Sequence, residues 1–268
     1  MNFTIPADAE LALRLGVFLA MFAALALWEW AAPARARRLS RTQRWGANLG
    51  LALLNTLVLR IVLPGSALAF ATLAAGEGWG LLNRVEVPGW VAVLAGVVVL
   101  DLVIYLQHVL FHTIPALARL HAVHHADPDF DVTTGIRFHP LEIVLSTLIK
   151  FAAIAALGAP VLAVLAFEIL LNASSMFNHA NASLPARLEP WVRRLLVTPD
   201  MHRTHHSVIE AERNSNYGFC LSVWDRWLGT YTPEARGELD IGLAAWRDPR
   251  EVATLSGVLR MPFMSGHV

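Results

Sequence analysis

What this chain can fold into is limited most by four long apolar stretches, which cover residues 11–30, 48–75, 88–107 and 141–177. A helix of about 20 apolar residues is long enough to cross the hydrocarbon core of a bilayer, which is roughly 30 Å thick. The mean hydropathy of +0.50 and the charged fraction of only 16% also lie outside the usual range of soluble proteins. The sequence therefore predicts an all-α integral membrane protein.

The fourth stretch is too long to be one spanning helix. Its 37 residues would extend roughly 55 Å at about 1.5 Å per residue, nearly twice the thickness of the hydrocarbon core. Gly158-Ala159-Pro160 lies at its middle, where proline removes a backbone donor and clashes with the preceding turn. We expect a re-entrant helical hairpin with both ends on one face, in addition to about three spanning helices.

The orientation follows from a cluster of arginines between the first two stretches, namely Arg35, Arg37, Arg38, Arg41 and Arg44. Positive charge favours the cytoplasmic side, so we expect the N-terminus outside and this loop in the cytoplasm of an inner or cell membrane. The third span then returns to the cytoplasmic face. The role of Arg60, in the second stretch, stays open; we favour a side chain that reaches to the outer interface.

The chain divides into four parts of a single membrane domain. These are the N-terminal spans (1–107), a first histidine-rich cytoplasmic segment (108–140), the hairpin (141–178) and a second histidine-rich cytoplasmic cap of helices (179–268). The formal net charge of zero argues against a nucleic-acid partner. The only cysteine, Cys220, excludes an intrachain disulfide, a CxxC redox pair and a thiolate iron–sulfur cluster.

Histidines form two copies of one pattern, HAVHH at 121–125 and HRTHH at 202–206. Residues three and four apart lie on one face of a helix, so each copy directs imidazoles toward a common volume. Nine histidines are expected to converge: His108, His112, His121, His124, His125, His179, His202, His205 and His206. Because one zinc takes four ligands, nine indicate two metal ions. Imidazole suits zinc, copper, iron and nickel, so the spacing leaves the element open.

Four other polar residues are candidates for a supporting role. Asp101 and Glu168 continue the helical stripes of His108 and His179, and metal-bound imidazoles need an acceptor on the other ring nitrogen. Simple hydrogen-bonded packing is an equal alternative for both. Asn178 and His139 are further candidates; for His139, before a proline, we favour this supporting role over a ligand or a residue that begins a helix.

The order of motifs resembles the fatty acid hydroxylase and sterol desaturase superfamily. The matching elements lie between residues 101 and 231: H-x3-H from His108, the two HxxHH copies, RFHP at 137–140, NH at 178–179, NxNYG at 214–218 and WDRxxGTY at 224–231. The first two spans resemble that superfamily only in being apolar.

The resemblance implies a membrane enzyme with a histidine-bound di-iron centre that hydroxylates or desaturates a sterol or fatty-acyl type lipid with O2. Carried over by position, the nine histidines would bind two iron ions, which zinc can replace in purified relatives. Because spans and cap use the whole sequence, we expect the electrons to come from a separate protein of cytochrome or ferredoxin type. The resemblance leaves open hydroxylation or desaturation, the lipid and the oligomeric state.

Two other classes of function remain as alternatives. A zinc-dependent membrane lipid hydrolase needs a general base, and Glu142 and Glu168 are the only obvious nearby candidates in the absence of an HExxH motif. A metal transporter or sensor is the other alternative. Transporters bind ions near the middle of the bilayer, whereas these histidines gather beyond the ends of the spans.

Overall fold

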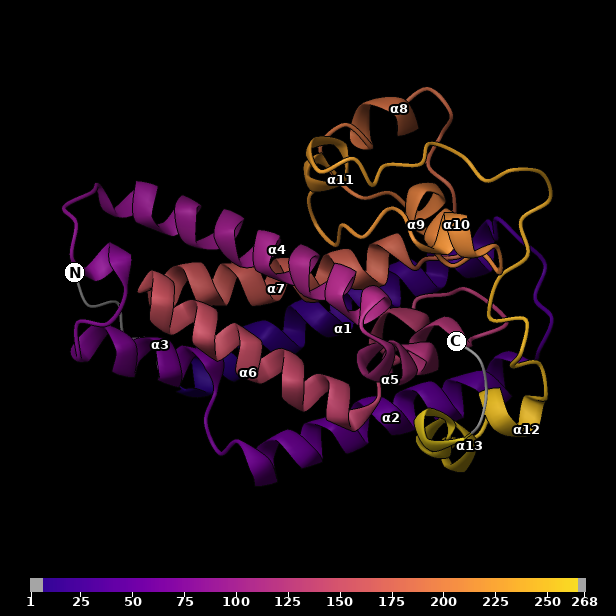
Figure 1. The fold of residues 1–268 in the computed structure, drawn as a ribbon, viewed down its shortest axis with the longest axis horizontal. Coiled ribbons are helices and arrows are strands. Elements are labelled where there is room, and N and C mark those ends of the chain that lie inside the picture. The colour runs from indigo at the N-terminus through magenta and orange to yellow at the C-terminus, as the bar shows by residue number, and fades with distance from the viewer. Residues whose placement is uncertain (1–6, 265–268) are drawn as a thin grey trace.

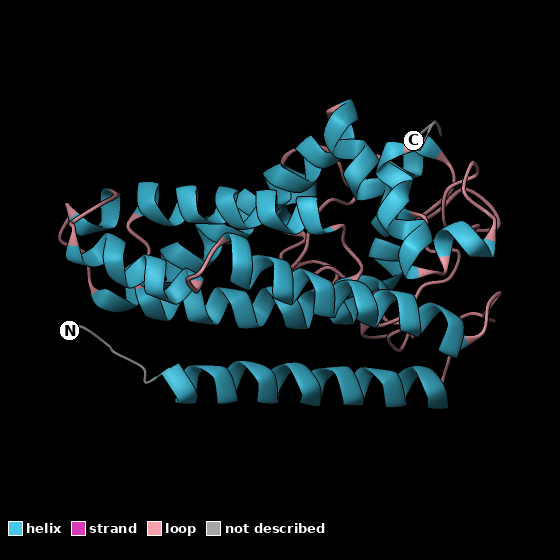
Figure 2. Ribbon diagram, turned by 90° about the horizontal axis from the view of Figure 1, so that it is seen from below, coloured by secondary structure: helices cyan, strands magenta, loops and turns pink. Residues whose placement is uncertain are grey.

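The computed structural model describes residues 7–264, and every regular element in that range is a helix, apart from three isolated β-bridges. Five long helices form a bundle (Figures 1 and 2): α1 (Ala7–Ala31), α2 (Arg41–Val62), α4 (Gly89–Thr113), α6 (Pro140–Leu157) and α7 (Val161–Asn178). Each is long and apolar enough to cross a membrane, with α3 (Ala67–Gly76) counted together with α2. The predicted all-α architecture is confirmed.

Shorter helices gather at one end of the bundle. They are α5 (Pro115–His125), α8 (Glu189–Val192), α9 (Pro199–His205), α10 (Glu210–Arg213), α11 (Val223–Trp227), α12 (Pro249–Val252) and α13 (Leu255–Arg260), with 3-10 turns at Leu81–Asn83, Thr134–Ile136 and Met261–Phe263. Helices α8 to α11 lie on one side of this end, and α13 packs against α2 on the other (Figure 1). Together they cover the histidine-rich end of the bundle.

Two helix boundaries differ from those expected. The second apolar stretch is broken at Pro64, which has no N–H to continue α2, and Ser66 begins α3 by accepting a hydrogen bond from the Ala69 N–H. The third span continues six residues beyond Gln107 and ends at Thr113, because Pro115 disfavours helix for the residue before it. His108 and His112 therefore lie on the last turns of a spanning helix.

The fourth stretch forms the predicted pair of helices, α6 and α7. The chain reverses at Gly158, whose φ of 69° lies in the left-handed region that favours glycine. Gly80 packs so tightly here that an added Cβ would lie 2.0 Å from the backbone nitrogen of Gly158. Each arm has 18 residues, or about 27 Å. That the hairpin re-enters instead of crossing the bilayer stays a prediction.

Large apolar side chains cover the outside of the bundle, where a soluble protein would carry polar groups. They include Leu19, Leu27, Leu53, Ile61, Trp90, Leu94, Leu148 and Leu170. A continuous exposed surface of this kind is unfavourable in water and fits contact with lipid chains. The N-terminus expected outside the cell falls in residues 1–6, beyond the described residues, and the side on which the histidine-rich end lies stays a prediction.

A buried ion-pair network fixes the loop between α5 and α6. The guanidinium of Arg44 donates to both carboxylate oxygens of Asp127, at 2.6 and 2.7 Å, and to Asp131 at 2.6 Å. Arg41 and Arg44 were expected in the cytoplasmic loop, but Ser40 caps α2 just before them, and Arg44 is fully buried. Burial acts to raise the pKa of Asp127, but the charge of Arg44 outweighs it and lowers this pKa to about 2.

Arg137 continues this network toward the histidines. Its buried guanidinium donates to the carbonyl of Val123 at 2.7 Å, the side-chain oxygen of Asn48 at 2.7 Å and the carbonyl of Val252 at 2.8 Å. These contacts join α5, α2 and α12. The position of the first HxxHH helix therefore depends on buried charges outside it.

We expect Arg44→Met to lower the free energy of unfolding by about 3–5 kcal/mol, because it leaves buried carboxylates without a counter-charge. In detergent this corresponds to a melting temperature lower by roughly 10 °C. The matched control is Arg60→Met on the same helix, where the arginine is exposed. Equal melting temperatures for the two variants would contradict the role assigned to the network.

Candidate metal centre

The nine predicted histidines lie together at the covered end of the bundle, in two groups. The five-histidine group contains His108, His112, His121, His125 and His205. The four-histidine group contains His124, His179, His202 and His206. Within each group, one ring nitrogen of every residue lies within 4.8 Å of the others, and all nine are buried except His112, which is partly buried.

Two short helices supply most of these side chains. Helix α5 begins with Pro115 at its first turn, and α9 begins at Pro199 after Thr198, which accepts a hydrogen bond from the Met201 N–H. Each helix contributes to both groups, so consecutive residues such as His124 and His125 lie in different groups, with ring centroids 5.3 Å apart.

Hydrogen bonds to carbonyls fix which ring nitrogen carries the proton. In the five-histidine group, the Nδ1 of His108 lies 2.7 Å from the Tyr217 carbonyl oxygen, and the Nδ1 of His205 lies 2.6 Å from the Ser215 carbonyl oxygen. A carbonyl only accepts, so both Nδ1 atoms donate and both Nε2 atoms carry lone pairs. These two Nε2 atoms are 3.1 Å apart, a distance at which facing lone pairs repel unless a cation lies near both.

The four-histidine group repeats this arrangement. The Nδ1 of His124 faces the Arg137 carbonyl at 3.2 Å, the Nδ1 of His179 faces the Ser175 carbonyl at 2.6 Å, and their Nε2 atoms are 3.1 Å apart. The Nε2 atoms of His202 and His206 lie 3.0 and 3.2 Å from that of His179. Two nitrogen ligands at right angles around one ion, with bonds of about 2.1 Å, are about 3 Å apart.

The protonation states fit ligands. Burial lowers the pKa of His121 and of His179 to about 3. Burial, followed by the neighbouring imidazoles, also lowers the pKa well below its usual value for His124, His125, His202, His205 and His206. At neutral pH these rings are therefore uncharged and keep the lone pair that a metal ion needs. The residues present fit a pair of metal ions.

Glu142 is the carboxylate that contacts a histidine of the centre. Its Oε1 lies 2.7 Å from the Nδ1 of His121, and both side chains are buried. A carboxylate at this position orients the imidazole and makes it a stronger donor to a metal. From the sequence, Glu142 is a candidate only for the general base of a hydrolase. Its place in the first turn of α6, directly after RFHP, was the signal for its proximity.

Asp101 and Asn178 act on the centre through a loop. Asp101 accepts hydrogen bonds from the N–H groups of Cys220 and Leu221 and from the Trp224 indole, at 3.3, 3.2 and 2.8 Å. Asn178 donates to the Phe219 carbonyl at 3.0 Å. Neither makes a hydrogen bond to a histidine. Both hold residues 217–224, which include the carbonyl that orients His108.

Glu168 and His139 lie elsewhere. Glu168 pairs with Lys150 and Arg14 inside the bundle. His139 caps α6, where its Nδ1 accepts a hydrogen bond from the Leu141 N–H at 3.2 Å, and it belongs to neither histidine group. The structure thus places His139 as a residue that begins a helix, one of the alternatives left open for it.

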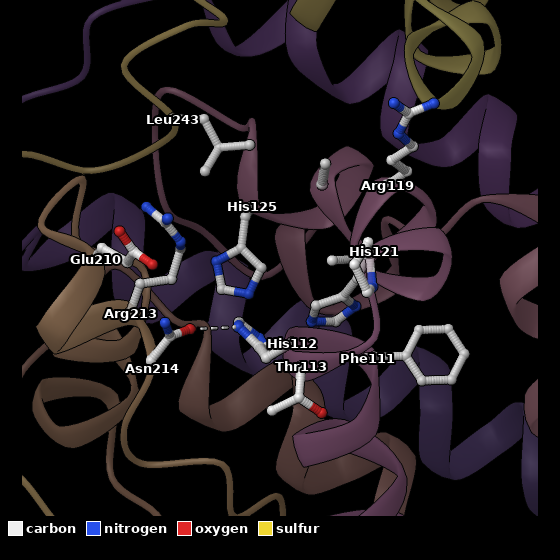
Figure 3. A pocket seen from close by; sticks show the side chains of 13 residues that line it. Phe111, His112, Thr113, Arg119, His121, His125, Glu210, Arg213, Asn214 and Leu243 are labelled. Atoms are coloured by element: carbon white, nitrogen blue, oxygen red, sulfur yellow. Dashed lines mark hydrogen bonds between the residues drawn. The ribbon is translucent and has the colours of Figure 1, made fainter. Parts of the chain in front are cut away.

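Cavities reach the five-histidine group from two sides. One, of about 300 Å³, is lined by His112, His121 and His125 and lies beneath the cap, where the Asn214 side chain faces His112 (Figure 3). The other, of about 370 Å³, lies within the bundle and is lined by His108, His121 and Glu142. The four-histidine group lines neither of these two cavities. A substrate inside the bundle would therefore meet the five-histidine group.

Curated relatives of the chain modify lipids. A region is 32% identical over 152 residues to the ornithine lipid hydroxylase OlsE of Rhizobium tropici, covering 56% of this chain and 45% of that protein. Alkylglycerol monooxygenase of Danio rerio is 30% identical over 163 residues, 59% of this chain and 34% of that protein. The human alkylglycerol monooxygenase is 28% identical over 145 residues, 54% and 31% of the two chains. The chain spans less than half the length of these relatives.

No solved structure matches the chain. Residues 93–230, just over half of its length, match the family model described as fatty acid hydroxylase, and this region contains all nine histidines of the two groups. The chain therefore belongs to the fatty acid hydroxylase family, within the fatty acid hydroxylase and sterol desaturase superfamily that its histidine motifs resemble.

Proposed function

We propose that this protein is an O2-dependent lipid hydroxylase with two iron ions, one bound by each histidine group. The observation that carries this proposal is the approach of Nε2 atoms to 3.0–3.2 Å in both groups, with inward lone pairs on His108 and His205 in one group and on His124 and His179 in the other. The similarity to a lipid hydroxylase and to monooxygenases supports hydroxylation over desaturation. Iron is preferred to zinc because the reaction of these relatives uses oxygen; zinc would fit the same imidazoles as a substitute.

The residues around the five-histidine group would have different roles in this reaction. His108 and His205 would bind one ion through Nε2, while the carbonyls of Tyr217 and Ser215 hold their tautomers. Glu142 orients His121 and draws its Nδ1 proton toward a carboxylate. Bound iron would supply the oxidising power that an unactivated C–H bond requires. The lipid would lie in the cavity within the bundle, which His108, His121 and Glu142 line.

The reaction needs reducing equivalents. Hydroxylation inserts one oxygen atom of O2 into a C–H bond, and the other atom leaves as water after taking up two electrons and two protons. We propose that a separate cytochrome- or ferredoxin-type protein delivers the electrons at the histidine-rich end. Arg35 and Arg38 lie in the loop at this end, where Arg35 donates to the Asn181 side chain and the Leu239 carbonyl. The positive charge of this loop supports a cytoplasmic location for this face.

The alternative functions receive less support from the geometry. In a lipid hydrolase Glu142 would be the general base, but the Oε1 of this carboxylate is engaged with the Nδ1 of His121. Glu168 lies in an ion pair with Lys150. A transporter would need ligands near the middle of the bundle, whereas all nine histidines lie on α5, on α9 and at the ends of α4 and α7.

Metal analysis of three variants tests the two sites. We expect wild-type protein to contain about two iron ions per chain, and His205→Ala and His206→Ala to lose the ion of the five- and four-histidine groups respectively. Both should lose O2-dependent turnover. His139→Ala is the control, since this histidine caps a helix outside both groups, and it should retain both ions. Wild-type protein with less than one ion per chain, measured by mass spectrometry of the metal, would refute the proposal.

The role of Glu142 is tested by substitution with leucine, which keeps the size but removes the acceptor for His121. We expect metal affinity or turnover to fall by about 10- to 100-fold, with a smaller loss for Glu142→Gln, whose amide oxygen still accepts. Thr147→Val serves as the control, because this residue lines the same cavity from the same helix and its hydroxyl bonds only to the Ile143 carbonyl. Titration with iron and oxygen uptake would measure the difference; indistinguishable values for the leucine and control variants would refute this role.

A further inference from the structure

The cavity within the bundle is more polar than a site for an acyl chain requires. It lies among α1, α2, α4, α6 and α7, yet 13 of its 24 lining residues are polar or charged. Polar groups at this depth in a membrane protein are costly and mark functional sites. Lipid chains would satisfy none of their hydrogen bonds.

Apart from Glu168 Oε2, which forms an ion pair with Arg14, three acceptors that line the cavity have no hydrogen-bond partner within the protein, among the described residues. They are the side-chain oxygens Asn55 Oδ1, Gln107 Oε1 and Glu142 Oε2. The amide of Asn55 is oriented by donation from its Nδ2 to the Phe138 carbonyl at 2.9 Å, which leaves its oxygen free. A buried acceptor without a partner is unfavourable. The histidine end of the cavity therefore calls for a ligand that brings N–H or O–H donors.

The opposite end carries charges that balance one another. Glu168 pairs with Lys150 and, at 2.8 Å, with Arg14, and Arg14 also pairs with Glu10 at 2.9 Å. Two cations thus face two carboxylates. A ligand with one sign of charge would disturb this balance. A zwitterion can insert into it, its cation beside Glu168 and its anion beside Lys150.

The two polar ends are separated by a distance that a headgroup can span. Lys150 follows Glu142 by eight residues on α6, which corresponds to about 12 Å along the helix. A volume of about 370 Å³ admits a polar group of several heavy atoms. The donors of such a group would meet Asn55 and Gln107 while its charged atoms meet the Lys150–Glu168 pair.

We propose that the substrate is a lipid with a zwitterionic, amine-bearing headgroup, and that this headgroup, not an acyl chain, occupies the cavity beside the five-histidine group. This inference rests on the proposed function, because it names the part of the lipid that the hydroxylase would receive. It assigns Asn55, Gln107, Lys150 and Glu168 as residues that determine specificity. A sterol or a plain fatty acyl chain would leave all four without a ligand partner.

The test measures lipid binding to the full-length protein in nanodiscs, without electron donor or O2. The probes share the same acyl chains: an amino-acid lipid with free ammonium and carboxylate, phosphatidylethanolamine, phosphatidic acid and diacylglycerol. We expect one of the two zwitterionic lipids to bind at least about tenfold more tightly than diacylglycerol, the equivalent of one charged hydrogen bond. Which of the two binds better identifies the anion, carboxylate or phosphate.

Two variants and a control locate the effect. Lys150→Met with Glu168→Gln removes one cation and one carboxylate together at nearly constant volume, so the fold should persist, and the zwitterion preference should fall about tenfold. Gln107→Met should weaken binding of the two amine-bearing probes and leave binding of diacylglycerol unchanged. The control removes the exposed pair of Arg250 and Asp248 by Arg250→Met with Asp248→Asn and should change nothing.

Equal binding of diacylglycerol and zwitterionic probes, tightest binding of phosphatidic acid, or a full preference in both cavity variants would overturn this inference. Those results would leave iron content and oxygen uptake unaffected, so the hydroxylase proposal would stand. Conversely, a protein that binds no iron but strongly prefers zwitterionic lipids would refute the proposed function. The assignment of the cavity as a headgroup-binding site would then still hold.

Discussion

One electrostatic constraint governs the structure: nine neutral imidazoles must be held in a buried volume, although several of their lone pairs face one another. Backbone carbonyls at Tyr217, Ser215, Arg137 and Ser175 determine the tautomers, and so direct four Nε2 lone pairs inward. Without positive charge this arrangement is repulsive. A metal ion in each group would turn the repulsion into attraction, so folding of this end and metal binding would be linked.

Of the carbonyls that orient the histidines, that of Ser175 belongs to helix α7, whereas those of Tyr217, Ser215 and Arg137 belong to loops that need support. Asp101 holds residues 220–224 through two backbone N–H groups and an indole. The loop after α5 is held by the buried ion pair of Asp127 with Arg44 of α2 and by hydrogen bonds from Arg137 to backbone carbonyls of α5 and α12. Helix α2, one of the five long helices of the bundle, therefore helps to position the histidines of the short helix α5. Buried polar contacts thus connect the apolar bundle to the polar cap.

The sequence was sufficient to predict the helices and the set of converging histidines, because apolar length and three- and four-residue spacing are local properties. It could not predict how the nine divide. That depends on the rotation of α5 and α9, which places His125 with His205 and His124 with His206. The interpretation of Arg44 as a membrane-surface charge was wrong, since its partner Asp127 lies 83 residues away in sequence. Contacts over such separations, including that of Glu142 with His121, arise only when the chain is packed.

The sharing of α5 between the groups has a consequence for how the two ions would behave. His124 and His125 are consecutive, so their Cα atoms are about 3.8 Å apart, yet they serve different groups. Any tilt or slide of this short helix moves a ligand of each ion at once. Two bound ions would therefore be coupled, because an ion in one group would restrain the shared helix and so help to order the ligands of the other group. The backbone sets the spacing between His124 and His125 and so limits the distance between the two groups. A bound lipid or a partner protein could change that distance only by moving α5.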